Sequence, residues 1–130
     1  MKHTLFAALG ALALASAPVH AHHGYADYFL DRTVAVEGTL EDLQYGNPHV
    51  VMKIRAANST LYTVSWQARW WVEAYAGVRK TTFAVGDHLI ISAAPPRDPA
   101  SHDLASVREI RRPRDGWDWK RQAPFPAPLN

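Results

Sequence analysis

Short runs of alternating apolar and polar residues make up most of the chain after residue 32, and this pattern determines the fold class that it can adopt. In one such run Val50, Met52 and Ile54 share one parity, whereas Lys53 and Arg55 take the other. A period of two residues indicates a β-strand with one buried face and one face in water. Similar runs predict strands over residues 34–45, 61–66, 88–94 and 104–111. We therefore expect a mainly β domain over residues 33–112.

The first of these strands is expected to bend. Leu40 and the apolar residues before it share one parity, whereas Leu43 and Tyr45 take the other. One extra residue near Glu41 and Asp42 would account for the change, so the pattern predicts a β-bulge there. A bulge bends its strand, as wrapping around a barrel requires.

The segment 68–76 has a different period and is expected to form one short helix. Trp71 and Tyr75 lie four residues apart, and Gly77 is a suitable residue for a helix C-cap. Three strands, a helix and two further strands is the order found in the OB-fold. We therefore predict a five-stranded OB-fold-like Greek-key barrel with the helix between strands three and four. A β-sandwich is the alternative, but it needs more strands than this chain supplies.

The first residues have the order of a secretory signal peptide. Lys2 is followed by an apolar run over residues 5–15 and by small residues that end at Ala21. Because this run is too short to span a bilayer, we expect cleavage after Ala21 and release into the bacterial periplasm. Cleavage after Ala17 also fits, but it would leave Pro18 beside the cut, where proline obstructs the peptidase. An uncleaved N-terminal anchor is the other alternative.

The expected organisation has four parts. These are a signal peptide (1–21), an N-terminal arm (22–32), a barrel domain (33–112) and a charged, then proline-rich tail (113–130). We expect the tail beyond Arg114 to be extended and partly disordered.

Composition narrows the range of functions. The chain has 14 basic and 12 acidic residues, a net charge of +2, which argues against a nucleic-acid binder. It has no cysteine, so disulfides, zinc ribbons, iron–sulfur clusters and blue copper sites are excluded. No catalytic motif is present, so we expect no enzymatic activity and no catalytic residue. We also expect a monomer with no membrane span.

Several short motifs together resemble the uncharacterised exported family known as domain of unknown function 6152. The motifs are Ala21-His22-His23-Gly24-Tyr25, Gly38-Thr39, Asn47-Pro48-His49, Gly77-Val78 and Gly86-Asp87. The resemblance covers most of residues 21–112. It implies an exported OB-type barrel of Gram-negative bacteria and no established activity. Gly24 departs from the serine that is usual in such proteins.

Cleavage after Ala21 would create a metal-binding group. The free α-amine of His22 and its own imidazole can chelate one ion, and a further imidazole would give the T-shaped nitrogen site that copper(II) accepts, called a histidine brace. His23 and His49 are the first candidates for the added ligand, and His102 lies in a second loop near the usual binding face. Residues 22–32 could span about 35 Å when extended, so reaching His49 is geometrically possible. The expected cofactor is therefore a copper ion.

The same residues have simpler interpretations. His22 and His23 would be a solvated chain start, and His49 would fix its turn through a backbone carbonyl. The runner-up function is a non-catalytic module that binds a peptide, a glycan or an envelope protein. Large aromatic residues near the helix are expected to pack in the core, with a ring-stacking surface as the alternative. They are Trp66, Trp70, Trp71 and Tyr75.

Overall fold

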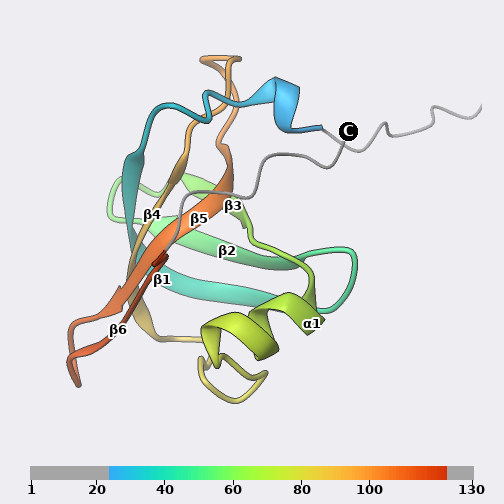
Figure 1. Ribbon diagram of the computed structural model, residues 1–130. Coiled ribbons are helices and arrows are strands. Elements are labelled where there is room, and N and C mark those ends of the chain that lie inside the picture. The colour runs from blue at the N-terminus through green and yellow to red at the C-terminus, as the bar shows by residue number, and fades with distance from the viewer. Residues whose placement is uncertain (1–23, 123–130) are drawn as a thin grey trace, which may run out of the picture.

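The alternating runs form antiparallel strands that curl into a closed barrel (Figure 1). The computed structural model describes residues 24–122. In chain order the elements are η1 (Tyr25–Asp27), β1 (Val34–Tyr45), β2 (Val50–Ala56), β3 (Leu61–Ser65), α1 (Arg69–Trp71), η2 (Val72–Ala76), β4 (His88–Ala94), β5 (Asp103–Arg112) and β6 (Trp117–Lys120). The predicted signal peptide and the expected cleavage site lie outside the described residues.

The strands follow one another in the order β3-β2-β1-β4-β5-β6. A parallel pairing between β3 and β5, in which Thr63 lies opposite Asp103, joins the two sides and closes five of the strands into a barrel. The prediction of a mainly β, five-stranded barrel with one short helix is confirmed. Within residues 24–122, no helix has both the length and the apolar character needed to cross a membrane.

The bend in β1 has two causes. The pairing with β2 shifts register between Leu40 and Asp42, which confirms the predicted bulge. Gly38 pairs with Ala56 of β2 on one side and with β4 on the other. A Cβ at Gly38 would lie 2.2 Å from the carbonyl oxygen of Arg55, so only glycine permits the strands to approach this closely.

The inward residues of the strands form a single main core, because each strand turns alternate side chains into the barrel. Aromatic pairs extend it. The rings of Trp66 and Trp119 have centroids 4.8 Å apart, and those of Phe83 and Trp117 are 5.0 Å apart. Trp66 is 1% exposed, so the expectation that it lies in the core is confirmed.

The tail beyond Arg114, which was expected to be extended and partly disordered, contains an ordered strand, β6, that was not predicted. This strand pairs with β5, so that Arg111 lies opposite Asp118 and Glu109 lies opposite Lys120. Opposite charges therefore meet across the two strands, and such pairs stabilise one register. The two tryptophans that alternate with these charges pack against the core instead of facing solvent. This alternation covers only four residues within a charged segment, so it was not recognised as a strand in the sequence.

The helical segment begins as α1 and continues as a π-helical turn, η2. It ends at Gly77, which has φ 65° and ψ 15°, the left-handed conformation expected of a glycine C-cap. Val72 is buried against the barrel. Trp70 and Tyr75 are 60% and 68% exposed, so the expectation that both are packing residues is wrong. A helix this short buries only the side that carries Val72.

A network of ion pairs connects the residue before β4 to the end of β5 and the turn that follows it. Asp87, which is 4% exposed, accepts from Arg112 at 3.0 Å and contacts Arg114 at 3.0 Å. Burial alone would raise the pKa of the Asp87 carboxyl. The hydrogen bond from the Ala84 amide and the two guanidinium groups outweigh burial, so the pKa is lowered and the group is held ionised.

Candidate functional site

His49 lies exposed at the end of the turn between β1 and β2. Its Nδ1 is 3.0 Å from the carbonyl oxygen of Trp66. A carbonyl oxygen only accepts hydrogen bonds, so Nδ1 carries the proton and the neutral ring has its lone pair on Nε2. His49 therefore bonds a backbone carbonyl, which is the simpler of the two roles expected for it. The same bond is also the usual way in which proteins orient a metal-binding histidine.

The carbonyl that holds His49 belongs to a rigid part of the barrel. Trp66 donates its backbone N–H to the Val50 carbonyl at 2.8 Å, and Val50 donates to the carbonyl of Gln67 at 3.0 Å. These two bonds continue the hydrogen bonding between β2 and β3 beyond Ser65, the last residue of β3. Because the Trp66 side chain is buried as well, the position of the carbonyl is fixed from both sides. His49 is thus an exposed side chain with a fixed anchor.

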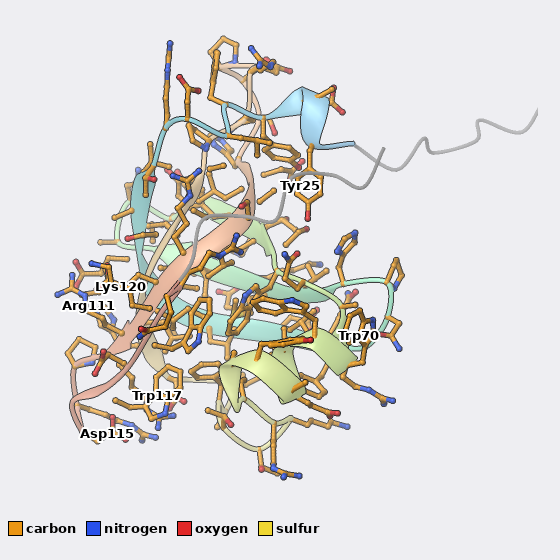
Figure 2. All side chains as sticks on the ribbon, viewed as in Figure 1. Tyr25, Trp70, Arg111, Asp115, Trp117 and Lys120 are labelled. Atoms are coloured by element: carbon orange, nitrogen blue, oxygen red, sulfur yellow. The ribbon has the colours of Figure 1, made fainter. Side chains whose placement is uncertain are left out.

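One side chain of the N-terminal arm, Tyr25, reaches the end of β3 that anchors His49. The Tyr25 hydroxyl donates to Oε1 of Gln67 at 3.1 Å, and Gln67 directly follows the residue that anchors His49. In Figure 2 the Tyr25 side chain points from the arm toward the strands. Partial burial raises the pKa of this hydroxyl, although the Arg121 charge and the bond to Gln67 act in the opposite direction. The hydroxyl is therefore protonated at neutral pH and able to donate.

Further contacts hold the rest of the arm on the barrel. Arg97 donates its backbone N–H to the carbonyl of Asp27 at 2.8 Å, and Phe29 donates to the carbonyl of Pro95 at 2.9 Å. Arg108 also donates to the Leu30 carbonyl. The arm therefore lies against the loop between β4 and β5 before β1 begins.

His22 and His23 lie outside the described residues. His22 precedes Tyr25 by three residues, and three residues of extended chain span about 10 Å. Tyr25 contacts Gln67, which directly follows the residue that anchors His49, so the described part of the arm begins close to this end of β3.

His102 lies at the opposite end of β3. Its carbonyl accepts from the backbone N–H of Thr63 at 3.1 Å, and its ring lies 5.4 Å from the ring of Tyr62. From Tyr62 to Trp66 the strand advances about 13 Å. His49 and His102 are therefore too far apart to bind one ion directly. In the part of the chain from 24 to 122, no three His, Asp or Glu side chains are grouped to hold a metal.

His88, the first residue of β4, forms an exposed pair with Glu37. Its Nε2 is 2.8 Å from Oε1 of that residue, across the β1–β4 pairing. This contact gives His88 a structural role between β1 and β4. It lies apart from the end of the barrel that His49 occupies.

Sequence reasoning missed the residues that support His49. Gln67 and Tyr25 are 42 positions apart in the chain, and no motif connects them. Only the β2–β3 register and the path of the arm bring them together. The position of Tyr25, two residues after the His22–His23 pair, was the one available signal.

Comparison with known proteins gives a family and no activity. The model of a family described as "Family of unknown function (DUF6152)" matches residues 10–105, which is more than half of the chain. No curated protein matches this chain. Any function must therefore be argued from the residues themselves.

Proposed function

The chain belongs to the DUF6152 family of unknown function, and we propose that it is an exported periplasmic protein that binds a transition metal, copper(II) first, for carriage or delivery. The ligands in this proposal are the α-amine and imidazole of His22 together with Nε2 of His49. His23 is an additional candidate. His102 is too distant from His49 to complete the same site.

The observation that carries the proposal is the orientation of His49. Its Nδ1 proton is held by the Trp66 carbonyl at 3.0 Å, so the lone pair of Nε2 is available to an ion. A ligand fixed in this way loses little conformational freedom when a metal binds. The side chain is also exposed, so an ion and a second ligand group can approach it.

The chemistry of the expected chain start supplies the other two ligands. A terminal amine has a pKa of about 8, so it loses its proton readily when a metal competes for the lone pair. Amine and imidazole nitrogens favour copper(II), which stands highest in the affinity order of the divalent first-row metals. Since the chain has no cysteine, no thiolate competes for the ion.

The path of the arm makes the arrangement compatible with the fold. Tyr25 bonds to Gln67, the residue after the His49 anchor, and this contact supports a site formed by the chain start and His49. We further propose that the barrel is of the OB type. The β3-β2-β1-β4-β5 order with a parallel closure supports this assignment, and the turn between the first two strands borders the binding face of such barrels.

The test is copper(II) binding to the exported, processed protein and to two single variants. His49→Ala removes the proposed third nitrogen, whereas His88→Ala removes an exposed histidine elsewhere on the barrel. We expect His49→Ala to weaken binding at least about tenfold, a loss of about 1.4 kcal/mol. His88→Ala should bind as the unmodified protein does. Equal affinities for all three proteins would exclude His49 as a ligand.

A second candidate function is a non-catalytic module for a peptide, glycan or envelope protein. The observation that favours it is the exposure of Trp70 and Tyr75, since large aromatic residues commonly provide binding surfaces. This function predicts partner binding that chelators leave unchanged and that substitution of these two residues weakens. Loss of partner binding on chelation would exclude it.

A further inference from the structure

A pocket of about 450 Å³ lies where the N-terminal arm meets the loop between β4 and β5. Arg97 donates its backbone N–H to the carbonyl of Asp27 at 2.8 Å, so the two segments lie side by side, at the top of Figure 1. Ligand pockets in proteins have volumes of about 300–1,000 Å³. We call this one the acidic pocket, and its polar lining consists of Asp27, Tyr28, Arg97, Asp98, Ser101 and Asp103.

The hydroxyl of Tyr28 is a buried polar group of this lining. Tyr28 is 7% exposed, and its ring packs on Ala94 and Ala105, which fixes its position. Within residues 24–122 the hydroxyl has no hydrogen-bond partner. A buried hydroxyl is destabilising without a partner, so we expect its partner to come from the pocket.

The protonation state of this hydroxyl leaves its oxygen able to accept. Burial raises the pKa of the Tyr28 hydroxyl, and the charges of Asp103 and Asp27 raise it further. The group is therefore neutral at ordinary pH, with lone pairs on its oxygen for an incoming donor.

Asp103 adds a carboxylate to the same pocket. Its backbone is fixed, because it pairs with Thr63 of β3 and donates its N–H to Oγ of Ser101 at 3.1 Å. The Asp103 side chain is half-buried, and in the described part of the chain it takes part in no ion pair. A partly buried carboxylate without a counter-charge favours the approach of a cation.

Arg97, the cation in the lining, is held by the arm. Its Nε donates to the carbonyl of Ala26 at 2.8 Å, and its guanidinium carbon lies 4.6 Å from the ring centroid of Phe29. The neighbouring Asp98 also forms no ion pair with any residue between 24 and 122, although its Oδ1 accepts from the Ala100 N–H at 2.9 Å. Arg97 therefore leaves the negative charge of the pocket uncompensated.

We propose that the acidic pocket binds a small organic cation that carries primary ammonium groups. An ammonium group has three N–H donors and no acceptor, so it matches the Tyr28 oxygen and the carboxylates of Asp98 and Asp103. The volume favours an organic ligand over a bare metal ion, which would fill a small part of it. Over the described range 24–122, no three His, Asp or Glu side chains are grouped to hold a metal. This inference is independent of the copper site, because His49 and its anchor take no part in it.

The test is isothermal titration calorimetry of the exported, processed protein with the diamine putrescine. The protein is first freed of metal with a chelator and exchanged into phosphate buffer, which contains no amine. The matched control ligand is the butanediol with the same carbon chain and no charge. We expect saturable binding of putrescine and none of the diol. No binding of putrescine at millimolar concentration, equal binding of both ligands, or displacement of putrescine by an equal concentration of calcium ions would overturn the proposal.

Two conservative variants show whether the acidic pocket is responsible. Tyr28→Phe removes the hydroxyl and keeps the ring, whereas Asp103→Asn removes the charge and keeps the shape. We expect Tyr28→Phe to weaken putrescine binding about fivefold and Asp103→Asn to weaken it at least about tenfold.

The matched control variant is Asp118→Asn. It removes the same charge from an exposed residue of β6, opposite Arg111 and near the other end of β5 from Asp103. This variant should bind putrescine as the unmodified protein does. Equal losses in Asp103→Asn and Asp118→Asn, or unchanged binding in Tyr28→Phe, would overturn the proposal.

A measurement on the unmodified chain does not depend on the folding of a variant. Backbone amide NMR signals are followed while putrescine is added to isotope-labelled protein. We expect the largest shifts at Ser101 and Asp103, and none at Glu73 and Ala74 of η2. Shifts that are largest outside the acidic pocket would overturn the proposal.

Discussion

His49 and Trp66 are joined by a single hydrogen bond, from Nδ1 of the exposed imidazole to the backbone carbonyl of a residue that is almost fully buried. The bond connects the turn between β1 and β2 to the end of β3. It fixes the tautomer of the ring and the direction of Nε2. An exposed histidine on an ordinary turn would have neither property.

Substitution of Gly38 by alanine should disrupt the barrel. The added Cβ would lie 2.2 Å from the Arg55 carbonyl oxygen, and this backbone atom cannot move without separating β1 from β2. We expect a loss of about 3 kcal/mol or more in the free energy of unfolding, measured by urea denaturation. Gly46→Ala is the matched control, because no heavy atom lies within 4 Å of its added Cβ. Equal stability of the two variants would contradict the close approach.

Substitution of Asp87 by asparagine should be strongly destabilising. The change removes one of the two carboxylates that lie 3.0 Å from the guanidinium of Arg112 and leaves Asp115 as the other. Because Asp115 still compensates part of the Arg112 charge, we expect a loss of about 2 kcal/mol or more in the free energy of unfolding. Glu41→Gln, which removes one partner of the exposed pair with Arg55, should have little effect. Urea denaturation of both variants measures the difference, and similar losses would show that burial of the Asp87 network has no energetic importance.

The same carboxyl should make stability depend on pH in the acid range. The pKa of Asp87 is lowered in the folded protein, so its contribution is complete above the ordinary carboxyl pKa. That contribution is lost as the pH falls below the ordinary value and through the lower folded pKa. Asp87→Asn should therefore show a shallower loss of stability than the unmodified protein between about pH 5 and about pH 2. Parallel curves would mean that Asp87 is not held ionised by folding.

The alternating runs specify most of the barrel, because a buried face repeats every second residue in a strand. The change of parity after Leu40 was sufficient to predict the bulge, and the His88–Ala94 strand begins and ends where expected. The position of β6 was not predictable, since its alternation covers only four residues between charged neighbours. Nor does a helix as short as α1 show from sequence which rings face the barrel.

The candidate site was predictable only in part. His49 could be singled out because it follows a proline turn at the edge of the expected barrel. Its anchor could not, because the contact between His49 and Trp66 depends on how β2 and β3 are aligned. The bond between Tyr25 and Gln67 depends further on the path of the arm.

Replacement of Trp119 by alanine should show that β6 is part of the folded domain. Its ring lies 4.8 Å from that of Trp66 and covers the core at this end of the barrel. We expect a loss of about 2 kcal/mol or more in thermal or urea unfolding. Val85→Ala, on an exposed side chain, should change stability by no more than about 0.5 kcal/mol. A Trp119→Ala protein as stable as the control would place the ring outside the core.

The most direct test of the proposed metal site is a copper(II) titration of two proteins that differ only at the chain start. One is the naturally processed protein, with intact mass confirming that it begins at His22, and the other carries three additional alanines before His22. A shorter extension would place a histidine third in the chain, where the new amine, two amide nitrogens and the imidazole would themselves chelate copper(II). The account predicts that the extension weakens copper(II) binding at least about tenfold, because it converts the chelating amine of His22 into an amide. Equal affinities, or a processed protein that begins at another residue, would contradict it.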